Sequence, residues 1–144
     1  MSEPLNLGDS VISAATTGEV ITSASDATGA TQAYLAGLGD IAAACIQCNF
    51  TYGSGGTSVK IVIETTFDQG STWIEVARFA FTTASAEKLF NLSAMTAKIA
   101  AYTPVALSDD TAVDGILGDR WRARKIVVGT YAGNSSVSVR MQAR

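Results

Sequence analysis

The sequence predicts an all-β protein: a single-domain β-sandwich of the jelly-roll type, with about eight short strands and an extended N-terminal arm. Three observations lead to this prediction. Apolar residues recur at every second position in several runs, turn-forming residues separate the runs about every ten residues, and no long helical pattern is present. The chain has 144 residues, which is enough for one hydrophobic core.

The clearest runs form a predicted hairpin in residues 57–83, where apolar and more polar residues alternate on both arms. Only a β-strand places alternate residues on one face. If the turn has four residues, the register brings Glu64 opposite Glu75. The alternating apolar residues are Val59, Ile61, Ile63, Ile74 and Val76.

The turn of this hairpin lies in residues 66–73. The Asp68 carboxylate can accept backbone N–H groups that a reversing chain leaves unpaired, and Gly70 can take a positive φ. The stretch TFDQGSTW resembles the Asp box, a hairpin motif of the form Ser/Thr-x-Asp-x-Gly-x-Thr-Trp that occurs in unrelated β proteins. That resemblance implies a structural role rather than a catalytic or metal-binding one for the turn residues Thr66, Asp68, Gly70, Thr72 and Trp73.

The second face of the hairpin carries three large aromatic residues in this register, Trp73, Phe79 and Phe81. A group of large aromatic side chains is rarely left exposed to solvent, so we expect the N-terminal segment or another molecule to cover this face. These three residues are therefore possible subunit contacts. A β-bulge that turns part of the face inward is the equal alternative.

Two features invite a chemical interpretation and have a simpler one. Glu64 and Glu75 could form the carboxylate pair of a glycosidase, but cross-strand neighbours reach that spacing by geometry alone. Cys45 and Cys48 form a CxxC pair within a predicted strand, where positions three apart face opposite ways. The chain has no His and no other Cys, so we expect no enzyme, no cofactor and no zinc site.

The acidic loop at residues 108–119 is the remaining candidate for a metal. The loop contains four acids that could bind calcium, but their spacing matches no known pattern of calcium ligands. They are Asp109, Asp110, Asp114 and Asp119. Solvated loop acids are the more common case.

The rest of the chain is assigned by pattern. Residues 1–10 have no periodicity and are predicted as an arm; residues 1–23 comprise this arm and the first strands, and residues 24–144 form the sandwich. Residues 25–39 remain undecided between a short strand and a helical turn, and residues 95–101 have helical propensity over a turn or two. Residues 11–15 and 19–23 are predicted as a first pair of strands or as one strand with a kink at Thr17 and Gly18. Further strands are predicted at residues 41–52, 86–93, 102–107, 121–130 and 135–142.

Charge is distributed unevenly along the chain. The first 59 residues contain acids but no Lys or Arg, whereas all charged residues after Asp119 are cations. We expect the acidic part to pack on the basic strands of the same chain or of a neighbouring subunit. The chain is acidic overall, with a net charge of −3, so we predict no direct contact with nucleic acid. No apolar run is long enough to span a membrane, and no secretory signal is visible.

Function is suggested by a resemblance. The segments TTFDQGSTWIEVARFAFTTASAEKLFNLSA and DGILGDRWRARKIVVGTYAGNSSVSVRMQA resemble small proteins encoded among the head genes of tailed bacteriophages. This resemblance implies a virion structural protein, assembled in the host cytoplasm. A jelly roll of this size resembles capsid decoration, or cement, proteins, which bind the major capsid protein on the shell surface and often form trimers.

The same resemblance leaves two alternatives open. A tail or head–tail connection protein could use the same strands, and a carbohydrate-binding module would need Trp73 or Trp121 exposed on a concave face. For a decoration protein, residues 1–23 are the candidate contact with a neighbouring sheet edge. We therefore expect deletion of residues 1–10 to weaken attachment to the shell and to leave the sandwich folded.

Overall fold

The computed structural model describes residues 4–93, 106–113 and 116–144, and every regular element in these ranges is a β-strand. The all-β prediction is confirmed. The strands are β1 (Leu5–Val11), β2 (Thr16–Val20), β3 (Ala24–Ser25), β4 (Thr31–Gln32), β5 (Ala43–Thr51), β6 (Ser54–Gly55), β7 (Ser58–Thr66), β8 (Ile74–Phe81), β9 (Ala86–Ser93), β10 (Thr111–Ala112), β11 (Arg120–Val128), β12 (Tyr131–Ala132) and β13 (Ser136–Ala143).

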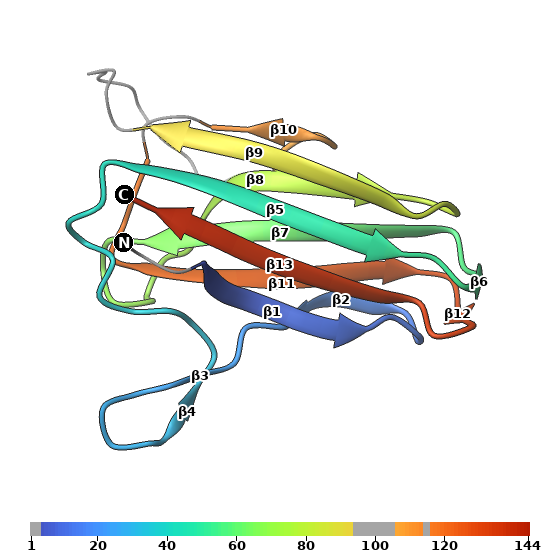
Figure 1. Ribbon diagram of the computed structural model, residues 1–144, viewed down its shortest axis with the longest axis horizontal. Helices are drawn as coiled ribbons and strands as arrows, with labels where there is room; N and C mark the ends of the chain where they lie inside the picture. The colour runs from blue at the N-terminus through green and yellow to red at the C-terminus, as the bar shows by residue number, and fades with distance from the viewer. Residues whose placement is uncertain (1–3, 94–105, 114–115) are drawn as a thin grey trace.

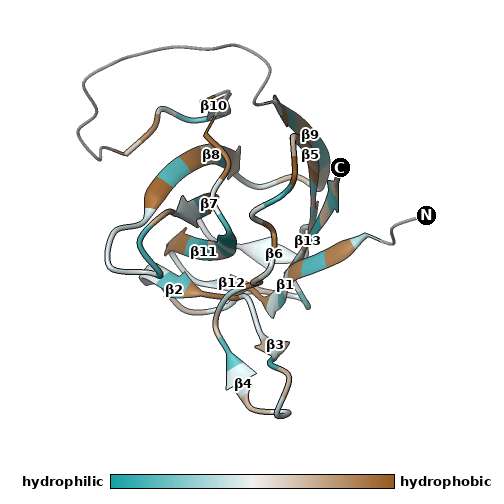
Figure 2. Ribbon diagram, turned by 90° about the vertical axis from the view of Figure 1, so that its left-hand side faces the viewer, coloured by the Kyte–Doolittle hydropathy of each residue, from teal (hydrophilic) through white to brown (hydrophobic). Residues whose placement is uncertain are grey.

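Two antiparallel sheets face each other (Figures 1 and 2). One has the order β1-β13-β5-β9, and the other has the order β10-β8-β7-β11-β2. Leaving aside the short β10, the eight long strands are divided between the sheets in the order of a jelly roll, in agreement with the prediction. Two short pairs, β3–β4 and β6–β12, complete the described part of the fold.

The core lies between the sheets, where inward-facing residues of all eight long strands except β2 meet. Strand β5 shows the alternation clearly, since Ile46, Cys48 and Phe50 are fully buried while Cys45 and Asn49 are exposed. The same alternation appears as brown and teal bands along the strands in Figure 2. Burial of each large aliphatic or aromatic side chain stabilises the fold by roughly 1.5–3 kcal/mol.

The chain enters the sandwich earlier than the sequence predicts. Leu5–Val11 form the edge strand β1 and pair with β13, so the expected arm at residues 1–10 is part of the sheet from Leu5 onward. A β-bulge between Asn6 and Gly8 buries two successive residues, Leu7 and Gly8, and hides the period of two. A Cβ on Gly8 would lie 2.7 Å from Cγ1 of Ile21, which explains a glycine there. Because Leu7 is fully buried, the structure argues against a sandwich that folds without residues 1–10.

The second strand is also shifted, to Thr16–Val20 in place of residues 19–23. One strand with a kink at Gly18 is therefore formed: the pairing with β11 shifts between Glu19 and Thr17, where Gly18 has a φ of 138°. A Cβ there would lie 2.5 Å from the guanidinium of Arg124, so Gly18 leaves room for an arginine of the neighbouring strand β11. Residues 11–15 link the two sheets and contain only the end of β1.

Residues 25–39, which the sequence left undecided, form neither a long strand nor a helix. Strands β3 and β4 make a small hairpin that projects from the sandwich (Figure 1). Beyond it the chain returns to β11, where Leu35 and Trp121 exchange backbone hydrogen bonds of 2.7 and 2.9 Å. The helical propensity noted at residues 95–101 falls outside the described residues, as does most of the strand predicted at 102–107.

Candidate interaction surfaces

The turn at residues 66–73 has the geometry expected from the residue types. Asp68 Oδ1 accepts the backbone N–H of Thr72 at 2.8 Å and the hydroxyl of Thr66 at 2.8 Å, and Thr66 Oγ1 accepts the N–H of Gly70 at 3.1 Å. Gly70 has a φ of 96°. The N–H of Thr72 and then the Thr66 hydroxyl hold the pKa of Asp68 below its ordinary value. The carboxylate is thus used by the turn itself.

Trp73 packs over this turn and against the side chains of Arg122 and Tyr34. The guanidinium of Arg122 lies 4.1 Å from the centre of the Trp73 ring, and the ring of Tyr34 lies 6.4 Å away. The indole is partly buried, because the turn at Gly70 and these two side chains surround it. Of the three aromatic residues expected as subunit contacts, Trp73 alone retains some exposure.

Phe79 and Phe81 are core residues, so their interpretation as subunit contacts is wrong. They are 0% and 4% exposed, and their rings lie 4.6 Å from Phe90 and 5.2 Å from Phe50 of the opposite sheet. A β-bulge is the cause: Ile63 pairs with Ala77 and Glu64 pairs with Glu75, so β8 has one extra residue. This extra residue turns the C-terminal half of β8 inward.

Glu64 and Glu75 lie opposite each other, as the register predicted, but each is held by arginine. The Glu64 carboxylate accepts a hydrogen bond of 2.8 Å from Nε of Arg122. It also accepts a bidentate pair of hydrogen bonds from Arg124, of 2.8 and 3.0 Å. The Glu75 carboxylate accepts a hydrogen bond of 2.6 Å from Nε of Arg78. Both carboxylates are nearly buried and already neutralised, which suits a structural network better than acid–base chemistry.

Three arginines on β11 lie on the outer face of the sandwich. Arg120, Arg122 and Arg124, here called the arginine face, alternate with the buried Trp121 and Ala123 and point away from the core. The sequence showed the alternation RWRAR, but it did not reveal which acids these arginines meet. Arg122 and Arg124 share the single carboxylate of Glu64.

Arg120 has a different environment from the other two. Its guanidinium lies 4.5 Å from the centre of the Tyr34 ring, and it donates a hydrogen bond of 2.8 Å to the carbonyl of Gln69. No carboxylate of the described residues pairs with it. Arg120 and Tyr34 line an open recess of about 470 Å³ beside the β3–β4 hairpin. Tyr34 belongs to the segment that the sequence left undecided, so pattern alone did not indicate this recess.

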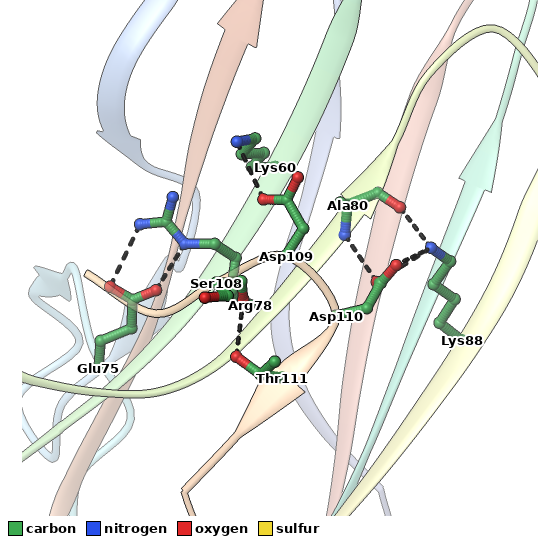
Figure 3. Close-up of polar contacts among 9 residues, drawn as sticks. All are labelled: Lys60, Glu75, Arg78, Ala80, Lys88, Ser108, Asp109, Asp110 and Thr111. Atoms are coloured by element: carbon green, nitrogen blue, oxygen red, sulfur yellow. Dashed lines mark hydrogen bonds and ion pairs between the residues drawn. The ribbon is translucent and has the colours of Figure 1, made fainter.

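A strap, residues 108–113, crosses from one sheet toward the other (Figure 3). Asp109 forms an ion pair of 2.9 Å with Lys60 of β7. Asp110 forms an ion pair with Nζ of Lys88 from β9 and accepts a hydrogen bond from the N–H of Ala80 in β8. Burial raises the pKa of Asp110, but the bonds from Lys88 and Ala80 outweigh it, so the net pKa is lowered. The acidic loop therefore uses Asp109 and Asp110 to fasten the strap to the sandwich.

The expected charge complementarity occurs within the chain. Asp9 of β1 pairs with Arg140 of β13 at 3.1 Å, and Glu19 of β2 lies 3.8 Å from Lys125 of β11. Both pairs join the acidic first third of the sequence to its basic last strands. Cross-strand neighbours of opposite charge support the register in which the first strands are held.

Cys45 and Cys48 face opposite sides of the sheet, as predicted. Cys45 is exposed and Cys48 is buried, and burial raises the pKa of the Cys48 thiol well above its ordinary value. Across the described ranges, no group of three or more acidic, Cys or His side chains is placed to hold a metal ion. In the same ranges, no helix is long and apolar enough to cross a membrane.

Trp121 does not offer a stacking surface for a sugar. It is fully buried, and its indole N–H donates to the carbonyl of Gly118 at 3.0 Å. Since Arg122 also covers Trp73, neither indole lies free on a concave face as a carbohydrate-binding module would require. The comparisons with known proteins add no relative, since no family model, no curated protein and no solved structure matches this chain.

Proposed function

We propose that this protein is a virion structural protein that binds the outside of a bacteriophage capsid shell and stabilises it. The observation that carries the proposal is the strand order of the two sheets, β1-β13-β5-β9 and β2-β11-β7-β8. That order is the jelly-roll fold implied by the resemblance of residues 65–94 and 114–143 to phage head-region proteins. The fold supports the proposal but is shared by many functions, so the surfaces must supply the rest.

A decoration protein works by broad contact with a shell, and several features suit that task. The β3–β4 hairpin projects from the sandwich, and the adjacent recess carries Tyr34 and Arg120. Tyrosine, tryptophan and arginine are the residues most enriched at the energetic centres of protein interfaces. The ion pairs of Glu64 and Glu75 hold the neighbouring arginines in fixed orientations, which lowers the entropy lost on binding.

The partner in this proposal is the major capsid protein, and a homotrimer is the favoured state of the protein on the shell. A direct test uses empty shells assembled from the major capsid protein encoded in the same genome. The purified chain should co-sediment with these shells and raise the temperature at which they break open. Failure to co-sediment at saturating concentration would contradict the proposal.

The number and position of copies separate decoration from a role in the tail or at the head–tail junction. Cryo-electron microscopy of saturated particles should show density at repeated positions over the whole shell. Density confined to one vertex or to the tail would favour the alternative. Sedimentation equilibrium of the free protein then tells whether trimers form before binding or only on the shell.

A further inference from the structure

We propose that the recess between the β3–β4 hairpin and the start of β11 is the docking site for an acidic segment of a partner protein, with a partner carboxylate pairing with Arg120. The proposal rests on the proposed function only for the identity of the partner, which would be the major capsid protein. Its physical basis is a guanidinium that is held in place and has no acidic partner within residues 4–93, 106–113 and 116–144.

Arg120 is oriented on two sides before any partner arrives. The Tyr34 ring lies against the guanidinium at 4.5 Å, and the Gln69 carbonyl accepts a hydrogen bond from Nη1 at 2.8 Å. The planar guanidinium has five N–H donors, so Nε and Nη2 remain available to a carboxylate in a bidentate arrangement. Orientation in advance reduces the entropy cost of forming that pair.

Charge on this side of the sandwich favours an acidic occupant. Arg122 and Arg124 have only Glu64 between them, and Arg120 has no carboxylate among the residues described. Asp26 also lines the recess, but its Oδ1 is engaged by the turn of its own hairpin, where it accepts bonds from Thr28 and Ala30. The lining itself carries one acid and one arginine, and the excess of cations on this side comes from Arg122 and Arg124, which share the single carboxylate of Glu64.

The walls of the recess select against a long polyanion. Apart from the polar residues Arg120, Tyr34, Asp26 and Gln32, they are built from small or apolar residues such as Ala27, Leu35 and Ala36. A nucleic-acid backbone needs a row of cations that are free to contact successive phosphates. Here Arg122 and Arg124 are already bonded to Glu64, so one carboxylate flanked by small side chains fits better.

The test is a titration of the full chain, labelled with ¹⁵N, with a blocked hexapeptide of alternating glutamate and alanine. Two further ligands are titrated in parallel: the same peptide with glutamine in place of glutamate, and a six-residue thymidine oligonucleotide. The glutamate peptide should shift the resonances of Arg120, Tyr34 and Leu35 and the indole N–H of Trp73, whereas the glutamine peptide should not. Stronger binding of the oligonucleotide than of the glutamate peptide, or shifts located elsewhere, would overturn the proposal.

Variants assign the effect to Arg120. Arg120→Gln should weaken binding of the glutamate peptide about tenfold, the loss expected for one charge-assisted pair. Arg120→Lys should bind the glutamate peptide with an affinity between those of wild type and Arg120→Gln, because lysine keeps the charge but cannot form the bidentate pair. The matched control is Arg144→Gln, since Arg144 also lacks a carboxylate partner among the described residues but lies at the end of the other sheet. Equal binding by wild type and Arg120→Gln would disprove the site.

Shell binding distinguishes failure of this site from failure of the proposed function. If wild type and Arg120→Gln co-sediment equally with shells, the docking site is wrong and the decoration role stands. If the glutamate peptide binds at Arg120 but shells do not bind the protein at all, the site stands and the decoration role is wrong. Circular dichroism of each variant confirms that the sandwich is intact before either comparison is made.

Discussion

The ammonium of Lys125 lies 2.9 Å from the hydroxyl of Ser10, so a cation of one sheet is bonded to the edge strand of the other. Lys125 points into the sandwich from β11, where its side chain is 9% exposed, and it also donates to the carbonyl of Val11 at 3.3 Å. On the opposite side of the sandwich, Lys88 of β9 donates to the carbonyl of Ala80 in β8. One buried or half-buried lysine thus links the two sheets at each open side.

Replacing Lys125 by methionine should destabilise the protein by about 1–2 kcal/mol, because the acceptors on Ser10 and Val11 lose their donor. Hydrogen exchange in β1 should speed up more than exchange in β7, since β1 is the strand that Lys125 holds. The control is Lys60→Met, because Lys60 makes a partly exposed pair with Asp109. Equal exchange in β1 for wild type and Lys125→Met would contradict this role.

Asp68→Ala should lower stability above pH 4 and have a smaller effect in acid. The pKa of Asp68 is lowered in the folded state, first by the N–H of Thr72 and then by the hydroxyl of Thr66. A lowered pKa contributes stability that is fully present above the ordinary value of 3.8 and is lost as the pH falls through the folded-state value.

Thermal unfolding of wild type and Asp68→Ala from pH 7 to pH 2 measures this linkage. The difference in Tm should be constant near neutral pH and shrink below pH 3.8. Protein concentration must be held fixed in this series, because any self-association also changes Tm. A difference that grows toward low pH has the wrong sign and would exclude the proposed role of the carboxylate.

Phe79→Ala should destabilise the folded chain by about 3–5 kcal/mol, the usual cost of deleting a buried ring. Phe79 is fully buried and packs 4.6 Å from Phe90 across the sheets. Phe67→Ala is the matched control, because Phe67 is 62% exposed and its loss should change stability by less than about 0.5 kcal/mol. Urea unfolding measures both; a variant at Phe79 that stays stable but loses self-association would restore the subunit-contact interpretation.

Glu64→Gln should destabilise the protein by about 3 kcal/mol, at the low end for breaking a buried ion pair. The substitution removes the charge shared by Arg122 and Arg124, whose side chains are only 22% and 25% exposed. Asp109→Asn provides the comparison, since its pair with Lys60 is more exposed and should contribute less than about 1 kcal/mol. If both variants unfold at the same urea concentration, the network around Glu64 is not structural.

Local pattern determined the strands in the middle and at the end of the chain. Residues 41–52 and 135–142 were predicted within two residues of β5 and β13, because inward and outward side chains alternate there without interruption. The turn at Asp68 was predicted from residue types alone, since its hydrogen bonds span at most four residues. The opposite orientations of Cys45 and Cys48 likewise follow from the period of a strand.

Tertiary structure decided the rest. The bulges at Gly8 and in β8 insert a residue into the pleat, so the period of two reverses without a signal in the sequence, and Phe79 and Phe81 turn into the core. The partners of the arginine face depend on pairings far apart along the chain, such as Glu64 with Arg124. Tyr34 likewise reaches Arg120 only because the chain returns to β11 at Leu35. These residues are far apart in the sequence, and the folded sheets bring them together.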